Sequence, residues 1–351
     1  MFIDRLLIYY YSLLILFTNF LLNLKIKLKK FKMALEKINI VWIQGQGCTG
    51  CTISVTGGTN PDLINVLTGF LPQIEGINLV YHPTIMGPWG ENASKILDDA
   101  INGKYDPFVL VVEGAVPDEK KAQETGGYYC GVGEIDGKMM LFDDVLLKLS
   151  KRAGAVVAVG ACASFGGIPH GNPNPTGAKG VINFLGKDYK SGLGLPVINL
   201  PGCPPSGETI IEALGHLVLT ARGALPVPEL DADNRPKFLY GPKVHEICPR
   251  AGYFAGGKYS SEFGEPYCMG MLGCKGIITH CQVPKRGFIE GAGGCTTVGG
   301  ICIGCTEPEF PDEPYSPFLQ KAPAGAYASE AMEDMVAKIK AVLSRMSSRK
   351  I

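Results

Sequence analysis

The sequence predicts an α/β protein in which a parallel sheet is followed by a small, irregular region. Between residues 37 and 226, short β-branched runs alternate with longer amphipathic runs, the pattern of parallel strands joined by crossover helices. Between residues 238 and 318 the chain is rich in Gly, Pro and Cys and has little apolar periodicity. The 351 residues are 46% hydrophobic and 19% charged, so the first region can bury a large core.

The first region divides into five predicted strands and three clear helices. Each strand is short and apolar, and each helix carries apolar residues at helical spacing. The predicted strands span residues 37–45, 77–86, 107–116, 155–164 and 196–204. The predicted helices span residues 91–101, 142–153 and 207–223. Five parallel strands with intervening helices favour a flavodoxin-like sheet for residues 37–226.

The second region, residues 238–318, needs another source of order. It follows a linker, VPELDADNRPKF, and contains too few apolar side chains for a large core of its own. Cross-linking by metal is the source of order that its cysteines indicate. Residues 327–346 then close the chain as an amphipathic helix, which is not a membrane anchor.

Residues 1–32 form an apolar and basic extension. An uncharged stretch from Leu6 to Leu22 precedes KIKLKKFK, and it is borderline in length for a transmembrane helix. The extension has neither a signal-peptide cleavage site nor a twin-arginine pair, so we expect no export. If the stretch is translated, its basic flank keeps the protein body in the cytoplasm, associated with the membrane. The other interpretation is that translation starts at Met33; both predict a cytoplasmic location.

The charge balance excludes partners that are bound by net charge alone. The chain has 33 Lys and Arg against 33 Asp and Glu, which gives a formal net charge of zero. Neither nucleic acid nor an anionic membrane surface is therefore expected as a partner.

Four of the 12 cysteines fall at the ends of predicted strands. Cys48 follows the first strand, Cys51 comes three residues later, and Cys162 and Cys203 end the fourth and fifth strands. Because parallel strands place their carboxyl ends at one edge, where open α/β sheets bind cofactors, these thiols can converge on one centre. Glu113 ends the third strand and is expected to point into the same crevice. The alternative is a solvated loop carboxylate.

Two further groups of ligands lie in the Cys-rich region. The first group combines an HxxC pair with a CxxxxxC pair and comprises His245, Cys248, Cys268 and Cys274. The second group ends in the motif CIGC and comprises Cys281, Cys295, Cys302 and Cys305. A histidine in HxxC beside so many thiols indicates a ligand, whereas the other histidines are expected to be structural. Soft thiolate ligands suit zinc or iron–sulfur clusters. The scattered spacing of the sheet-edge set favours iron–sulfur over zinc.

The order of these motifs resembles the small, electron-transferring subunit of the [NiFe] hydrogenases. The motifs are GCTGC, VEG, GACASFGG, NPTGA, PGCPP, HEICPR, CMGMLGCKG and CIGCTEPEFPD, and the resemblance covers roughly residues 37–318. It implies a proximal [4Fe-4S] cluster on Cys48, Cys51, Cys162 and Cys203, and a distal [4Fe-4S] cluster on His245, Cys248, Cys268 and Cys274.

The resemblance also implies a medial cluster on Cys281, Cys302 and Cys305. Cys295 stands where many members of the family carry proline, and their medial centre is [3Fe-4S]. We therefore expect Cys295 to be a fourth ligand and the medial cluster to be [4Fe-4S]; if Cys295 is not a ligand, [3Fe-4S] is expected. The alternative for Cys295 is a small buried hydrophobe.

A [NiFe] hydrogenase oxidises or forms H2 at a nickel–iron site, and in this family the large subunit holds that site. Beyond the motifs already assigned, this chain has no second pair of CxxC motifs with the DPCxxC-type C-terminus that the large subunit uses to hold nickel and iron. The resemblance therefore implies an obligatory large-subunit partner, in a heterodimer that can assemble further, and an external electron acceptor that the sequence does not identify.

Cys130, in GGYYCGVG, is the cysteine outside the three sets. In oxygen-tolerant members a similar cysteine pairs with one at the position that is Gly50 here, so we expect Cys130 near an ordinary proximal cluster and unligated. Two other functions remain open. A complex I-type quinone reductase subunit shares the sheet and one cluster but has no use for the later ligands. A zinc-stabilised interaction protein would have no redox role.

Overall fold

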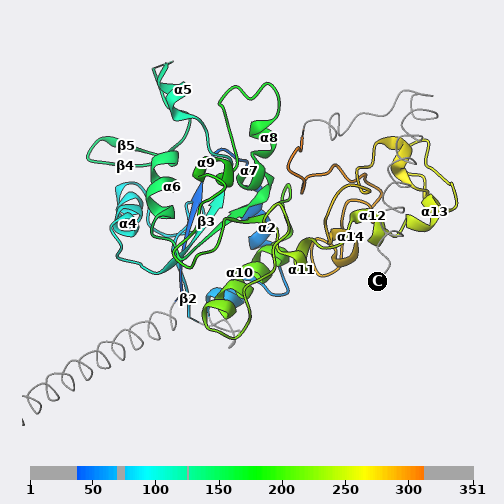
Figure 1. Cartoon of the computed structure of the whole chain (residues 1–351), viewed down its shortest axis with the longest axis horizontal. Helices are drawn as coiled ribbons and strands as arrows, with labels where there is room; N and C mark the ends of the chain where they lie inside the picture. The colour runs from blue at the N-terminus through cyan, green and yellow to red at the C-terminus, as the bar shows by residue number, and fades with distance from the viewer. Residues whose placement is uncertain (1–37, 69–75, 125, 312–351) are drawn as a thin grey trace, which may run out of the picture.

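A computed structural model of the chain describes residues 38–68, 76–124 and 126–311 (Figure 1). Its centre is a five-stranded sheet in the order β2-β1-β3-β6-β7, and every neighbouring pair is parallel. Counted among these strands alone, the order is 2-1-3-4-5, which is the flavodoxin-like order. The predicted fold class is confirmed. The strands are β1 (Ile38–Gln44), β2 (Ile77–Tyr81), β3 (Phe108–Glu113), β6 (Ala155–Val159) and β7 (Ile198–Leu200).

Helices cover both faces of the sheet because successive strand residues point to opposite sides. In β1, Val41 and Ile43 pack into one buried cluster, whereas Ile40 and Trp42 pack into the other. The cluster around Val41 includes residues of α4 (Glu91–Ile101), α6 (Phe142–Ser150) and α9 (Val181–Leu185). The cluster around Trp42 includes residues of α2 (Gly50–Thr56), α3 (Leu63–Leu67) and α10 (Gly207–Ala221).

The three predicted helices are present, with differences at their ends. Helix α4 has the predicted bounds, α6 ends three residues early, and α10 ends at Ala221. Helix α10 begins after Ser206, whose side chain accepts a hydrogen bond from the backbone N–H of Thr209 at 3.3 Å. This N-cap fixes the start of the longest described helix just after Cys203.

A β-hairpin, which the sequence analysis did not identify, follows α5 (Glu119–Glu124). Its strands are β4 (Gly131–Ile135) and β5 (Lys138–Leu141), and they pair antiparallel. Asp136 and Gly137 both have positive φ, 48° and 72°, as a two-residue hairpin turn requires. The Asp-Gly pair between alternating residues was the sequence signal that could have predicted it.

The predicted strands also run past the observed ones at their carboxyl ends. The run predicted to reach residue 86 stops at Tyr81, directly before His82-Pro83. The run predicted to reach residue 164 stops at Val159, and α7 (Gly160–Phe165) and α8 (Gly167–His170) follow. These corrections place Cys162 at the start of a helix and not at the end of a strand.

Residues 238–311 contain short helices, turns and isolated bridges, and no strand is assigned in this part of the chain. The elements from the end of the linker onward are α11 (Lys237–Tyr240), α12 (Val244–Ile247), α13 (Ala251–Ala255), the 3-10 helix η1 (Met269–Leu272) and α14 (Val283–Arg286). Leu239 and Tyr240 still belong to the large cluster around Trp42. The buried apolar groups after them are small: Phe310 packs with Ala161 of α7, and Met269 and Leu272 pack with Ile301. In Figure 1 this region lies beside the α7 side of the sheet.

The extension predicted for residues 1–32 and the helix predicted for residues 327–346 lie outside the described residues. The described residues contain no helix that is both long and apolar enough to cross a membrane. The boundaries 37–226 and 238–318 stay predictions.

Candidate metal centres

The first predicted set gathers at the carboxyl edge of the sheet. Cys48 follows β1, Cys51 lies in α2, Cys162 lies in α7 after β6, and Cys203 follows β7. Residue Thr49, between the first two cysteines, is in the left-handed region with φ 63° and starts α2. The loops after β6 and β7 are joined by a hydrogen bond from the N–H of Ala161 to the carbonyl of Gly202, at 2.8 Å.

The electrostatics of Cys51 indicate that these four thiols are neighbours. Burial, then Glu113, and then the thiols of Cys162, Cys203 and Cys48 all raise the pKa of Cys51 far above its usual range. Thiolates crowded in this way repel one another unless a metal neutralises them, and a coordinated thiol is deprotonated outright. The donor set therefore fits a metal cluster.

Gly160 allows the close approach of α7 to Cys51. A Cβ atom at this position would lie 2.5 Å from Cys51 Sγ, and the residue has φ 90°. Only glycine meets both conditions without strain.

Glu113 lies beside this set as a buried carboxylate, 3% exposed, so the alternative of a solvated loop residue is wrong. Its Oε2 accepts hydrogen bonds from Trp42 Nε1 at 3.0 Å, from Gln44 Nε2 at 2.9 Å and from Thr52 Oγ1 at 2.5 Å. Its Oε1 accepts from the backbone N–H of Thr52 at 3.0 Å. Because Thr52 directly follows Cys51, this network fixes the start of α2.

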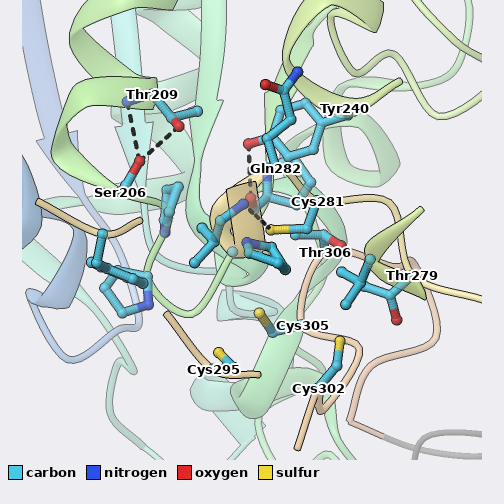
Figure 2. Close-up of a pocket in the computed structure, with 18 of the residues that line it drawn as sticks. Ser206, Thr209, Tyr240, Thr279, Cys281, Gln282, Cys295, Cys302, Cys305 and Thr306 are labelled. Atoms are coloured by element: carbon cyan, nitrogen blue, oxygen red, sulfur yellow. Dashed lines mark hydrogen bonds between the residues drawn. The ribbon is translucent and has the colours of Figure 1, made fainter. Parts of the chain in front are cut away.

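The second centre is a cavity of about 60 Å³ that Cys281, Cys295, Cys302 and Cys305 line together (Figure 2). Its walls are mostly apolar and include Tyr240 and Ile303. The backbone N–H of Val283 donates to Cys281 Sγ at 3.4 Å. Burial, and then the thiols of Cys281, Cys302 and Cys295, raise the pKa of Cys305 well above its usual value.

The third centre is a cavity of about 40 Å³ lined by His245, Cys248, Cys268 and Cys274. Three backbone N–H groups donate to its thiols: Arg250 to Cys248 at 3.4 Å, Gly270 to Cys268 at 3.4 Å and Cys302 to Cys274 at 3.3 Å. Hydrogen bonds of this kind are among the factors that tune iron–sulfur clusters.

His245 is presented to this cavity by α12. Its ring meets the ring of Phe254 edge-on, with centroids 4.4 Å apart. Burial lowers the pKa of His245, which favours the neutral imidazole that binds metal.

The three sets form a series in space. The N–H of Cys302 in the second set donates to Cys274 of the third. Cys203 of the first set is among the charges that act on Cys305 of the second. Tyr240 lies between these two sets, because its hydroxyl donates to the carbonyl of Pro201 at 2.8 Å while its ring lines the second cavity.

Two residues near the second cavity were missed by the sequence analysis. Glu307 accepts hydrogen bonds from His280 and forms an ion pair with the buried Arg235. Burial raises the pKa of Glu307, but the hydrogen bonds from His280 and the charge of Arg235 outweigh it and lower the pKa overall. Glu307 follows Cys305 by two residues, and this proximity was the available signal. Arg235 lay in the predicted linker and gave none.

Cys130, the cysteine outside the three predicted sets, lies beside the hairpin. It precedes β4 and packs into the cluster that contains Phe142. Burial, then Glu119 and Asp143, raises the pKa of Cys130 to about 11. The remaining histidines hold structural contacts: His82 is buried against Trp42, and His280 bonds to Glu307.

Within the described residues, no three Cys, His, Asp or Glu side chains are gathered closely enough to bind one metal ion directly. The ligands of the second and third sets are spread around cavities. Soft thiolates, apolar walls and N–H donors directed at sulfur fit an iron–sulfur cluster in each.

Comparison with known proteins shows which family uses this arrangement. Residues 240–319 match the family model for the NiFe/NiFeSe hydrogenase small subunit, C-terminal part. The periplasmic [NiFeSe] hydrogenase small subunit of Desulfomicrobium baculatum is 35% identical over 286 residues, 79% of this chain and 85% of the relative. The chain belongs to the small subunits of the nickel–iron hydrogenases.

Other comparisons agree with this family. The F420 non-reducing hydrogenase I small subunit of Methanosarcina mazei is 34% identical over 328 residues, covering 86% of this chain and 80% of the relative. The actinobacterial-type NiFe hydrogenase of Ralstonia eutropha H16 superposes with a TM-score of 0.78 at 35% identity, covering 91% of this chain and 93% of that one.

Residues 48–217 match the model for the 20 kDa subunit of NADH ubiquinone oxidoreductase, the quinone reductase that was left open above. That match stops before the second and third sets, whereas the hydrogenase small-subunit model, over residues 240–319, contains both. The chain is therefore the electron-transferring small subunit of a hydrogenase, it carries iron–sulfur clusters, and it acts with the large subunit.

Proposed function

We propose that the three ligand sets hold three iron–sulfur clusters in a line from the large subunit to an external acceptor. The observation that carries the proposal is that the two later sets each line one cavity, while the first gathers at the sheet edge. The clusters would supply one-electron relay, and the chain fixes their spacing and surroundings. Cys48, Cys51, Cys162 and Cys203 would hold the proximal cluster, and His245, Cys248, Cys268 and Cys274 the distal one.

The medial cluster is proposed to be [4Fe-4S], on Cys281, Cys295, Cys302 and Cys305. Cys295 lines the same cavity as the other three thiols. The residue is exposed in the isolated chain, which argues against the alternative of a small buried hydrophobe. Four thiolates around one cavity leave no iron of a cubane without a protein ligand.

His245 would set the properties of the distal cluster. A neutral imidazole in place of one thiolate removes a negative charge from the ligand set. The reduction potential of the distal cluster should then be higher than that of an all-cysteine cluster. Histidine ligation raises the reduction potential of Rieske centres in the same way.

The large subunit is proposed to cover the carboxyl edge of the sheet. Cys48 and Cys203 are exposed there in this chain. Ile53 of the adjacent α2 is 66% exposed, and a large apolar side chain at that place suits an obligate interface. The acceptor would then approach the distal set, and electrons would leave the protein there during H2 oxidation.

We further propose a cytoplasmic location. The support is the basic run KIKLKKFK that follows the apolar stretch Leu6 to Leu22, because basic flanks are typical of the cytoplasmic side. The names of the relatives do not all give this location, and some are periplasmic enzymes. Immunodetection of the subunit in separated cytoplasmic, membrane and periplasmic fractions tests this, and recovery from the periplasm would refute it.

The central experiment is analysis of the purified two-subunit complex. It should contain nickel, about twelve irons per small subunit for three [4Fe-4S] clusters, and H2-dependent dye reduction. The small subunit alone should be inactive. Zinc in place of iron, with no visible absorption, would refute the cluster assignment, and full activity of a nickel-free isolated chain would refute the need for the partner.

A further inference from the structure

A buried group of charges lies beside the second cavity. The side chain of Arg235 is 4% exposed and forms ion pairs with three carboxylates. Its Nε is 2.7 Å from Asp231, one Nη is 3.0 Å from Asp233, and the other Nη is 3.0 Å from Glu307. One guanidinium faces three carboxylates, so the group carries more negative than positive charge.

The same group holds the backbone next to two ligands of the medial set. Glu307 Oε1 accepts a hydrogen bond from the N–H of His280 at 2.6 Å, directly before Cys281. Arg235 Nη1 donates to the carbonyl of Thr306 at 2.9 Å, directly after Cys305. Thr306 itself lines the cavity, and Figure 2 shows it beside Cys281. The two loops that carry Cys281 and Cys305 are thus tied together through one ion pair.

Glu307 and Asp233 differ in what they can influence. Glu307 is tied to the medial set on both sides: it accepts from the N–H of His280, directly before Cys281, and it pairs with the arginine that bonds to Thr306. Asp233 pairs with the same arginine, but its backbone carbonyl accepts from Asn199 Nδ2 at 2.8 Å, on the side of β7. Negative charge near a cluster stabilises its oxidised form, because reduction adds an electron.

We propose that Glu307, held in place by Arg235, is a positioning residue of the medial cluster. It fixes the backbone beside Cys281 and Cys305, and its charge lowers the reduction potential of the cluster that this set holds. The inference rests on the proposed function, since it takes the medial set to bind an iron–sulfur cluster.

The test uses the two-subunit complex and an EPR-monitored redox titration. Glu307→Gln keeps a side chain of the same shape and removes the charge, so the midpoint potential of the medial cluster should rise while that of the distal cluster stays unchanged. Asp233→Asn is the matched control, because it removes the same charge from another partner of Arg235. Its effect on the medial potential should be clearly smaller.

A Glu307→Gln complex with full iron and an unchanged medial potential would overturn the proposal, and so would an equal shift in Asp233→Asn. If Glu307→Gln loses the medial cluster, Glu307→Asp decides, because it keeps the charge. A Glu307→Asp complex with full iron and a medial potential near that of the unmodified complex supports the proposal. A raised potential in Glu307→Asp, or loss of the cluster from both variants, would leave Glu307 as structural support alone. Absence of a medial signal from the unmodified complex would instead refute the cluster assignment.

Discussion

The sheet edge and the Cys-rich region hold their ligands by different physical means. At the edge, Cys48, Cys162 and Cys203 follow strands that are anchored in two large apolar clusters. In residues 241–311 the buried apolar clusters are small, and the candidate ligands are held by short helices, N–H groups directed at sulfur and the Arg235 ion pairs. We therefore expect the sheet to fold without metal, whereas order in the second region should depend on metal.

The largest expected effect is on the folding of the two regions after iron is removed. In the iron-free chain, the amides of residues 240–311 should exchange rapidly with deuterium, because metal binding there supplies folding free energy. The amides of β1, β3 and β6 should stay protected by the apolar core. Mass-spectrometric hydrogen exchange measures both regions in one sample. Equal protection in both would show that the Cys-rich region is ordered without its clusters.

A substitution at the sheet edge should abolish electron transfer without unfolding the sheet. Cys48→Ala removes a thiolate from a set with no spare ligand, so the proximal cluster should be lost and H2-dependent dye reduction with it. Isotope exchange between H2 and deuterated water, which needs only the partner's nickel–iron site, should persist. Cys130→Ala is the control, and it should keep full iron because Cys130 lies outside the three sets. Retained dye reduction in Cys48→Ala would point to Cys130 as a substitute ligand.

The effect at the far end of the line should be smaller. His245→Ala removes a ligand from the proposed exit cluster. Dye reduction should fall by at least about 10- to 100-fold, which is the cost of losing only an outer partner of a metal ligand. Isotope exchange at the partner's site should survive. His216→Ala, which removes a half-buried histidine that stacks on Phe238, serves as the control. Parallel loss of both activities in His245→Ala would indicate a structural role.

The smallest change in activity, and the sharpest spectroscopic one, is expected at Cys295. Cys295→Pro should convert the medial cluster to [3Fe-4S], produce its EPR signal in the oxidised complex and raise the medial potential, because a thiolate and an iron are lost. Val298→Ala, at an exposed neighbouring position, should produce no such signal. The same signal at about one spin per molecule in the unmodified complex would mean that Cys295 is not a ligand.

The sequence by itself determined the fold class, the family and the candidate ligands. Apolar residues recur with one period in strands and another in helices, and both periods can be read directly from the sequence. The parallel sheet and helix α4 could therefore be predicted. The ligands could be proposed because their chemistry is carried by residue type and their spacing by short motifs such as CIGC. The Asp-Gly hairpin turn at Asp136 was equally local, and it was overlooked.

Only the tertiary structure decided which groups meet across long separations. Arg235 lies 71 residues from Thr306, whose carbonyl it contacts, and it also pairs with the next residue, Glu307. No local pattern in the sequence links Arg235 to either residue. Glu113 is buried because Trp42, Gln44 and Thr52 converge on it from other elements. Cys302 donates to Cys274 only because two irregular loops pack together. Burial and contact across loops depend on the whole packed chain, so sequence spacing cannot supply them.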